Sequence, residues 1–311
     1  MANEIVKYRN RLNQIPLRKF NTREMNLFFT IASRFTEKGT KEITFSFSSL
    51  KKLSNYSDFG ERFIDDLQKT YNKMLNINAY TDDGDTITRF VAFNKYQIKR
   101  SRHIVTISVN PEFKGLFNDL INSFTRFSLE EFTRLKSTYA KTMFRIIKQF
   151  RTTGYLEFKI TDFRNLLDIP KSYKTNDINK RVLKPVKIEL SPIFRSFAYK
   201  KLKQKSQGNK IIGYKFTWQP EAKDKNDFQD TWQHYREQIE NIKTNEFLEP
   251  KEKQASQKLI KNHFFKKVKT SRSTILIKGN LEKKDLRKKV KSTSNDKAKQ
   301  ALADYKRQDK D

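Results

Sequence analysis

The clearest pattern in the first part of the chain is a helical repeat of apolar residues after position 21. Asn21 followed by Glu24 matches a capping box, so this pattern predicts a helix over residues 22–35. The next predicted elements are a strand at 43–47 and helices at 48–54 and 60–75. Helix, strand, helix, helix is the element order of half a winged helix.

A hairpin is predicted next. Two β-branched segments, residues 77–81 and 86–93, flank a turn rich in aspartate, and we interpret this hairpin as the wing. The turn residues Asp82, Asp83 and Asp85 are interpreted as a solvated turn rather than a metal site. The pattern also predicts a strand at 100–109 and a short helix from Pro111 to Leu120.

The same plan repeats from Ser128 onward. Ser128 and Glu131 match a second capping box, a long helix with an apolar stripe follows, and Gly154 is suited to end it. The pattern then predicts a strand at 155–160, a helix opened by Thr161 and closed by Pro170, and strands at 197–202 and 211–218 that form a basic wing around a flexible turn at 207–209.

Between these elements lies a helix that Asp177 is predicted to cap. Its apolar residues Ile178, Val182, Val186 and Leu190 fall four apart on one face. Its other face is basic and polar, as in a helix that enters a DNA major groove. Pro185 removes one backbone hydrogen bond, which costs about 3 kcal/mol in a regular helix. We therefore expect the helix either to bend there or to divide into two.

These elements predict an α+β fold with two tandem winged-helix domains and a helical, partly disordered C-terminal extension. The expected domains are residues 1–124, residues 125–220 and an extension over 221–311. Within the extension, helices are predicted at 232–242 and 249–268, and the chain is expected to be disordered from Ser292.

The charge of the chain points to a polyanionic partner. Lys and Arg number 66 against 35 Asp and Glu, which gives a formal net charge of +31. Nucleic acid is the favoured partner over an acidic membrane surface, because no segment approaches the roughly 20 apolar residues of a spanning helix. The first residues lack the apolar core of a signal peptide, and cysteine is absent. We therefore expect a cytoplasmic protein.

No catalytic or cofactor motif is found. The three histidines, His103, His234 and His263, are too far apart in sequence to form a local metal pair. Gly208 and Gly213 have the spacing of a phosphate-binding loop, but Tyr214 stands where the loop needs a lysine. The sequence thus favours a protein without an active site, metal or cofactor.

Polar residues on the predicted second helix of each domain, on the second domain's wing and at the start of the strand at 100–109 are the expected DNA contacts. Asn side chains suit adenine, Lys and Arg suit guanine, and mobile lysines suit phosphates. Taken alone, such charges describe any solvated amphipathic face; the repeated plan and the adjoining wing favour DNA. Asp65 and Asp66 weaken the first domain's helix as a candidate. The expected residues are Lys174, Asn176, Asn179, Lys180, Arg181, Lys184 and Lys187 on the second domain's helix; Lys200, Lys201, Lys203, Lys205 and Lys210 on its wing; and Arg62, Lys69, Lys73, Lys99, Arg100 and Arg102 in the first domain.

Two segments resemble a known family. LKSTYAKTMFRIIKQFR, residues 135–151, and INKRVLKPVKIEL, residues 178–190, are similar to the second winged helix of iteron-binding plasmid replication initiators of the theta type. The resemblance covers roughly residues 1 to 218. It implies binding of direct repeats in double-stranded origin DNA, opening of adjacent AT-rich DNA, and recruitment of the host initiator and replicative helicase.

The resemblance also implies that such a protein represses its own promoter as a homodimer while monomers bind the repeats. By position it assigns the recognition helix to Asn179, Lys180, Arg181, Lys184 and Lys187. Two alternatives remain at this point: a winged-helix repressor or partition protein, and a DNA-processing enzyme that would need metal or ATP.

Overall fold

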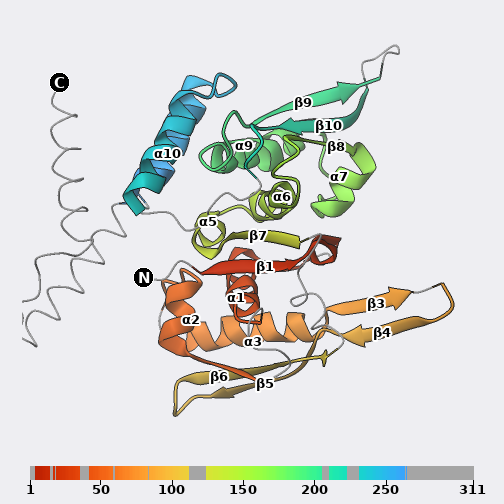
Figure 1. Ribbon diagram of the computed structural model, residues 1–311, viewed down its shortest axis with the longest axis vertical. Coiled ribbons are helices and arrows are strands. Elements are labelled where there is room, and N and C mark those ends of the chain that lie inside the picture. The colour runs from red at the N-terminus through yellow and green to blue at the C-terminus, as the bar shows by residue number, and fades with distance from the viewer. Residues whose placement is uncertain are drawn as a thin grey trace, which may run out of the picture. The chain divides into compact units, whose positions relative to one another are not determined.

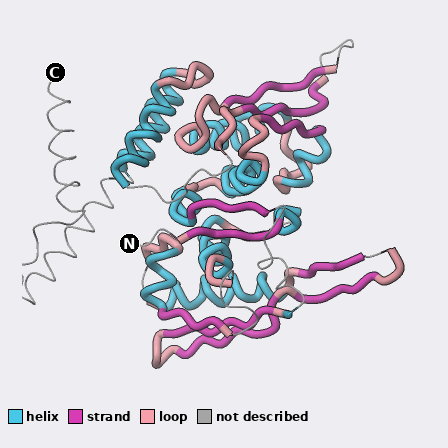
Figure 2. Tube along the Cα trace, viewed as in Figure 1, coloured by secondary structure: helices cyan, strands magenta, loops and turns pink. Residues whose placement is uncertain are grey.

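The computed structural model describes residues 4–14, 17, 19–35, 42–58, 60–82, 84–111, 124–204, 210–222, 231–262 and 264. They belong to two compact units, Met1–Phe228 and Gln229–Asp311. The first unit contains two winged helices (Figure 1), and Figure 2 shows how helices and strands alternate along it. The short helix expected after Pro111 and the disorder expected from Ser292 lie outside the described residues.

The first winged helix begins with the predicted capping box. Asn21 accepts a hydrogen bond from the backbone of Glu24, and the Glu24 carboxylate accepts one from the backbone of Asn21. Helix α1 (Thr22–Ala32) ends earlier than the sequence predicted. The elements that follow are β2 (Ile43–Ser46), α2 (Phe47–Leu53) and α3 (Glu61–Leu75).

Three antiparallel strands in the order β2-β6-β5 complete this domain. β5 covers Phe93–Lys99 and β6 covers Ile104–Val109. Ile43 faces Ile107 and Phe45 faces Val105 across the β2–β6 pair, and all four side chains are buried. The sequence had not predicted β5, and the strand expected at 100–109 begins only at Ile104. The turn between β5 and β6 is therefore the tip of the wing.

The hairpin predicted at residues 77–93 is present, but it is not the wing. β3 (Asn78–Asp82) and β4 (Ile87–Val91) pair with each other and with no third strand among the described residues. They extend as a separate two-stranded arm in Figure 1. Turn residues predict that a hairpin forms, but they do not predict which sheet its strands join. Ile87 and Val91 remain 63% and 40% exposed, so the arm has no buried face of its own on β4.

A short sheet connects the two halves. β1 (Ile5–Arg9) pairs with β7 (Phe124–Ser128), and neither strand was predicted. α5 (Leu129–Arg134) follows, but the Ser128 side chain forms no capping bond, so the second capping box predicted there is wrong. A separate helix, α6 (Thr138–Gln149), is capped instead by Ser137, whose hydroxyl accepts from the backbone of Ala140.

The second winged helix repeats the order of the first. β8 (Tyr155–Lys159) and α7 (Ile160–Leu166) lead to a helix over residues 175–190, and β9 (Ala198–Lys203) and β10 (Ile211–Thr217) form the predicted wing. The sheet order is β8-β10-β9. Helix α7 begins one residue before Thr161, after a cap at Lys159. The turn predicted at 207–209 lies outside the described residues.

Gly213 has a structural reason to be glycine. It lies on β10, where an added Cβ would come within 2.2 Å of the backbone oxygen of Phe158 on β8. This close approach of two backbones, rather than a phosphate, accounts for the residue that matched the spacing of a nucleotide loop.

Helix α6 joins the two winged helices through buried polar contacts. Lys141 is fully buried and donates to the Asn26 side chain at 2.6 Å and to the Phe132 carbonyl at 2.5 Å. Arg145 donates to the Tyr8 hydroxyl at 3.2 Å and to the Leu12 carbonyl at 3.1 Å. These contacts hold α6 to the first winged helix and to α5.

The second unit contains α10 (Thr231–Lys243) and a further helical segment at 250–262. Both were predicted from the sequence. No described helix of the chain combines the length and the apolar character that crossing a membrane requires.

Candidate nucleic-acid interface

The helix over residues 175–190 is continuous but not uniform. It runs as α8 (Thr175–Asp177), a π-helical turn η2 (Ile178–Leu183) and α9 (Lys184–Leu190). The sequence had suggested Asp177 as the N-cap of this helix, but the N-cap is Lys174. Asp177 stands inside the first turn, and its carboxylate accepts from the backbone of Lys174 at 3.1 Å. A carboxylate in the first turn interacts favourably with the positive end of the helix dipole.

Pro185 neither divides this helix nor ends it. The backbone N–H of Lys184 donates to the carbonyl of Asn179, five residues back, and Pro185 stands immediately after this wide turn. A π turn is one of the ways in which a helix accommodates an interruption of the regular hydrogen-bond ladder. The structure thus gives a third solution beside the two that the sequence suggested.

The helix separates an apolar face from a basic one, as predicted. Ile178, Val182, Val186 and Leu190 are all at most 2% exposed. Most of the polar residues predicted to contact DNA lie on the opposite side and are exposed. The exposed ones are Lys174, Asn176, Lys180, Arg181 and Lys184, whereas Asn179 and Lys187 are half-buried.

Arg181 is held in place by its neighbours. Its guanidinium lies 5.2 Å from the centre of the Tyr173 ring, and Nε is 3.7 Å from the Asp177 carboxylate. The Tyr173 phenol and Asp177 raise the pKa of Arg181, so the group stays charged. Because its side chain is still 63% exposed, the ion pair contributes little to stability and leaves the guanidinium accessible.

Two residues outside the predicted set position this helix. Arg164 on α7 donates to the Tyr173 carbonyl at 2.6 Å and to the Pro170 carbonyl at 3.2 Å, which fixes the turn before the helix. Glu189 accepts from the backbone of Lys136 at 2.7 Å and from that of Ser137 at 3.2 Å, at the start of α6. Burial raises the pKa of the Glu189 carboxyl, and these backbone donors oppose that shift.

The wing of the second domain carries lysines next to one another on β9. Lys200 and Lys203 are exposed, Lys201 is half-buried, and Lys210 is exposed at the start of β10. Lys205 lies outside the described residues. No acidic residue occurs on β9 or β10, although Lys215 on β10 pairs with Glu157 on the neighbouring strand β8.

In the first domain, helix α3 is a weaker candidate. Lys73 donates to the buried carboxylate of Glu24 at 2.6 Å, so its charge is used inside the protein. Arg62 lies 3.4 Å from Asp58 but is 65% exposed, and Lys69 is exposed beside the exposed Asp65. The acidic neighbours reduce the attraction of this surface for phosphate.

The tip of the first wing is a stronger phosphate candidate. Lys99, Arg100 and Arg102 are all exposed in or beside the turn between β5 and β6. Arg100 approaches Glu61 at 3.3 Å, but both side chains are more than half exposed. An ion pair of this kind exchanges readily for a phosphate.

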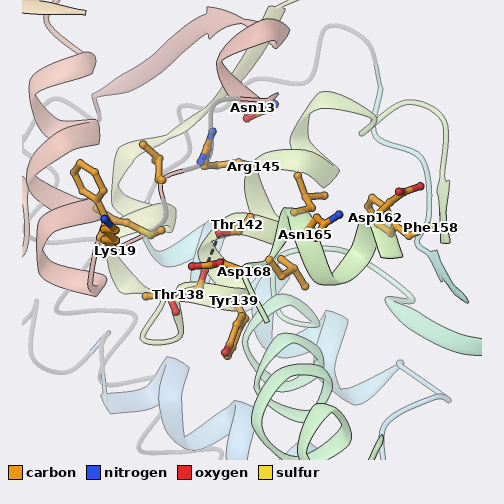
Figure 3. A pocket seen from close by; sticks show the side chains of 15 residues that line it. Asn13, Lys19, Thr138, Tyr139, Thr142, Arg145, Phe158, Asp162, Asn165 and Asp168 are labelled. Carbon is orange, nitrogen blue, oxygen red and sulfur yellow. Dashed lines mark hydrogen bonds between the residues drawn. The ribbon is translucent and has the colours of Figure 1, made fainter. Parts of the chain in front are cut away.

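A cavity of about 480 Å³ lies where residues 13–25 meet α6 and α7 (Figure 3). Its charged lining is balanced between Lys19, Arg145, Asp162 and Asp168. Arg145 is already bound to Tyr8 and Leu12. Because the two carboxylates offset the two cationic side chains, the cavity has no excess positive charge that would favour a nucleotide phosphate. Within the part of the chain that the structure describes, no group of His, Asp and Glu side chains has the arrangement of a metal site.

Sequence reasoning found the basic helix and the lysines of the second wing, and it singled out Lys99, Arg100 and Arg102 although it placed the first wing at residues 77–93. It missed Tyr173, Arg164 and Glu189. The first two lie in and before a turn whose shape depends on side-chain-to-carbonyl bonds, and spacing alone gives no signal for such bonds. Glu189 acts on backbone more than fifty residues away.

Comparison with known proteins gives consistent results. A model described as "Initiator Replication protein, WH1" matches residues 5–148, and one described as "Initiator Rep protein, WH2" matches residues 159–218. A "Probable replication protein rep" of Bifidobacterium longum (strain NCC 2705) is 33% identical over 226 residues, which cover 71% of this chain and 75% of that protein. The crystal structure of the Pi initiator protein in complex with iteron DNA aligns with a TM-score of 0.56 at 12% identity, over 70% of this chain and 98% of that one.

Proposed function

From the premise that this chain belongs to the initiator replication protein family, we propose that it starts plasmid replication by binding repeated double-stranded DNA sequences at an origin. One observation carries this proposal: the exposed basic face of the helix over residues 175–190, beside a wing whose two strands carry lysines and no acidic residue. A helix of this width fits a B-DNA major groove, and lysines on a wing neutralise the adjacent phosphates.

In this proposal the two domains divide the work. The second domain reads bases with residues 176–184 and holds phosphates with Lys200, Lys201, Lys203, Lys205 and Lys210. The first domain adds phosphate contacts through the tip of its wing, with Lys99, Arg100 and Arg102. We do not carry Lys73 into the interface, because Glu24 already neutralises it. We propose the same domain limits as the sequence predicts, 1–124, 125–220 and 221–311.

The remaining steps of initiation are assigned to binding energy and partners. The protein opens AT-rich DNA without covalent chemistry, recruits the host initiator and replicative helicase, and acts in the cytoplasm. A homodimeric form represses its own promoter. A dedicated repressor or partition protein would share the DNA-binding surface, and membership in the initiator family favours replication.

The interface is tested by the double substitution Lys180→Ala and Lys184→Ala. Affinity for an origin repeat should fall at least tenfold, because two exposed charges leave the groove-facing side of the helix. A matched control, Lys95→Ala with Lys251→Ala, removes the same charge from other exposed positions and should have a much smaller effect. Equal affinity losses in the two variants would remove this helix from the interface.

Replication itself needs a separate test. A plasmid that carries this gene with its flanking repeats is introduced into a host in which it cannot otherwise replicate. The wild-type protein should maintain the plasmid and the double variant should not. Repeat binding without plasmid maintenance by the wild-type protein would favour the repressor.

A further inference from the structure

The buried residues of the helix over residues 175–190 would be spread widely around a regular α-helix. Ile178, Val182, Val186 and Leu190 recur every four positions, and Leu183 is buried beside them. In an α-helix, with about 100° per residue, three steps of four would drift by about 120° around the axis. One extra residue in a single wide turn returns about 100° of this drift. The π turn at Ile178–Leu183 supplies that residue.

Pro185 secures the wide turn from its C-terminal side. In a regular α-helix its ring would press against the carbonyl of residue 181, and its missing N–H would leave that carbonyl unpaired. With the Lys184 N–H bonded to the Asn179 carbonyl, the ladder is already displaced before the proline is reached. The apolar period and the proline therefore select the same local geometry.

Asn179 lies in the π turn, and its side chain has an unsatisfied polar atom. Its side-chain oxygen Oδ1 is buried and has no hydrogen-bond partner among the described residues. Its neighbours along the chain are the apolar Ile178 and the exposed Lys180. Burying an unpaired amide oxygen is unfavourable, so a hydrophobic or small residue would be better for the free protein. An asparagine here has no structural benefit that the contacts reveal.

We propose that the π turn is an inserted residue that serves recognition, and that Asn179 is its specificity-determining side chain. On binding, the Asn179 amide turns out of its half-buried position toward the groove and forms paired hydrogen bonds with an adenine edge, through N6 and N7. Lys180, within the turn, and Lys184, directly after it, bind the flanking phosphates or bases. This inference rests on the proposed function and names the base that the helix reads. π turns of this kind occur often at functional sites.

The substitution Asn179→Ala separates reading from folding. It changes no charge, so affinity for a random duplex and the salt dependence of binding should stay as in the wild type. Discrimination between the origin repeat and a repeat with one A·T pair changed to G·C should fall by about tenfold or more at a single position. The melting temperature should be unchanged or higher, because an unsatisfied oxygen is removed.

Deleting Asn179 tests the inserted-residue origin of the turn, and this deletion and its control are both made in a Pro185→Ala background, because the proline ring would clash with the regular helix that the deletion restores. The deletion leaves Ile178 and Val182 three positions apart, which suits a regular α-helix, so the protein should fold and lose the same discrimination. Deleting Ile188 from α9 is the matched control. That segment has no wide turn to absorb the loss, so Leu190 would rotate by about 100° out of the core and the domain should unfold.

Each outcome decides the matter. Folding of the first deletion variant with unchanged discrimination, or an unchanged base preference in Asn179→Ala, would overturn the reading role. Unfolding of both deletion variants would overturn the inserted-residue explanation. Equal affinity losses on cognate and random DNA in Asn179→Ala would assign Asn179 a structural role. A wild-type protein that does not prefer the repeat to random DNA would overturn the proposed function itself, and this inference with it.

Discussion

Lys141 is the most unusual single residue in the fold. It is a lysine of α6 with no exposed surface, packed against α1 and α5, and its Nζ atom lies 4.3 Å from the centre of the Phe132 ring. Burial lowers the pKa of Lys141 well below its usual value, and Glu189 opposes the shift only in part. A neutral amine keeps two N–H donors, which is enough for the two acceptors, Asn26 and Phe132.

This pKa shift predicts a pH dependence of stability. The unfolded chain binds a proton at Lys141 up to its ordinary pKa, whereas the folded chain releases it earlier. The free energy of unfolding should therefore rise with pH between the lowered pKa and about 10.5, and the penalty should be fully present below that window.

Urea unfolding at several pH values checks this prediction against Lys141→Met, in which the titrating group is gone. The wild type should gain stability relative to the variant as the pH rises. The other lysines titrate alike in both proteins, so they cancel in the comparison. Parallel pH profiles would mean that Lys141 does not titrate differently on folding.

Single residues were predicted best where the signal is local. The capping box at Asn21 and Glu24 involves positions three apart, and it forms as expected. The assignment of a cap to Asp177 was wrong by three positions, because Lys174 begins the helix and an aspartate is equally at home inside the first turn. The role of Glu189 was invisible, since its partners are backbone groups remote in sequence.

At the scale of elements, strand pairing identifies the wing of the first domain: β5 and β6 join the sheet of β2, whereas β3 and β4 pair only with each other among the described strands. The turn between β5 and β6 is closed by the His103 N–H, which donates to the Arg100 carbonyl at 3.2 Å. His103 adopts a left-handed backbone conformation, with φ at 50°. The turn thus presents Arg100 and Arg102 at the end of a sheet that α1 and α3 hold from one side.

This placement predicts that Arg100→Ala with Arg102→Ala changes how binding depends on salt. Each lost phosphate contact should reduce the slope of log affinity against log salt concentration by about 0.9, without altering the base preference. Lys95→Ala is the control, because Lys95 lies at the opposite end of β5. Titrations of a fluorescent duplex at several salt concentrations measure the slope. An unchanged slope in the arginine variant would place the tip away from DNA.

The elements that the sequence missed have a common physical cause. β5 alternates only weakly, because most of its side chains are exposed or half-buried, and so its period is hidden. β1 and β7 are short and find each other over more than a hundred residues, so no local pattern announces them. The π turn was signalled by the four-residue period and by Pro185, yet neither signal alone distinguishes a wide turn from a bend.

At the scale of the whole molecule, the net charge of +31 makes electrostatics the dominant attraction to DNA. Binding to the cognate repeat should weaken steeply as salt rises, with a log–log slope of about 0.9 for each phosphate neutralised. Binding to random DNA should show a comparable slope at a lower affinity. Competition titrations between the two duplexes at several salt concentrations test this expectation. A flat response would contradict the assignment of the basic surfaces to phosphate.

The pairing of β1 with β7 also has a consequence for synthesis. β1 leaves the ribosome first, yet its partner lies at residues 124–128. At roughly 5–20 residues per second, the first strand waits on the order of ten seconds for its complement. Until then Val6 and Tyr8, both fully buried in the finished protein, lack the cover that β7 gives them, although Tyr8 can already contact Phe29 on α1. The first winged helix can assemble its own three-stranded sheet during this interval. The β1–β7 pair therefore forms after that sheet.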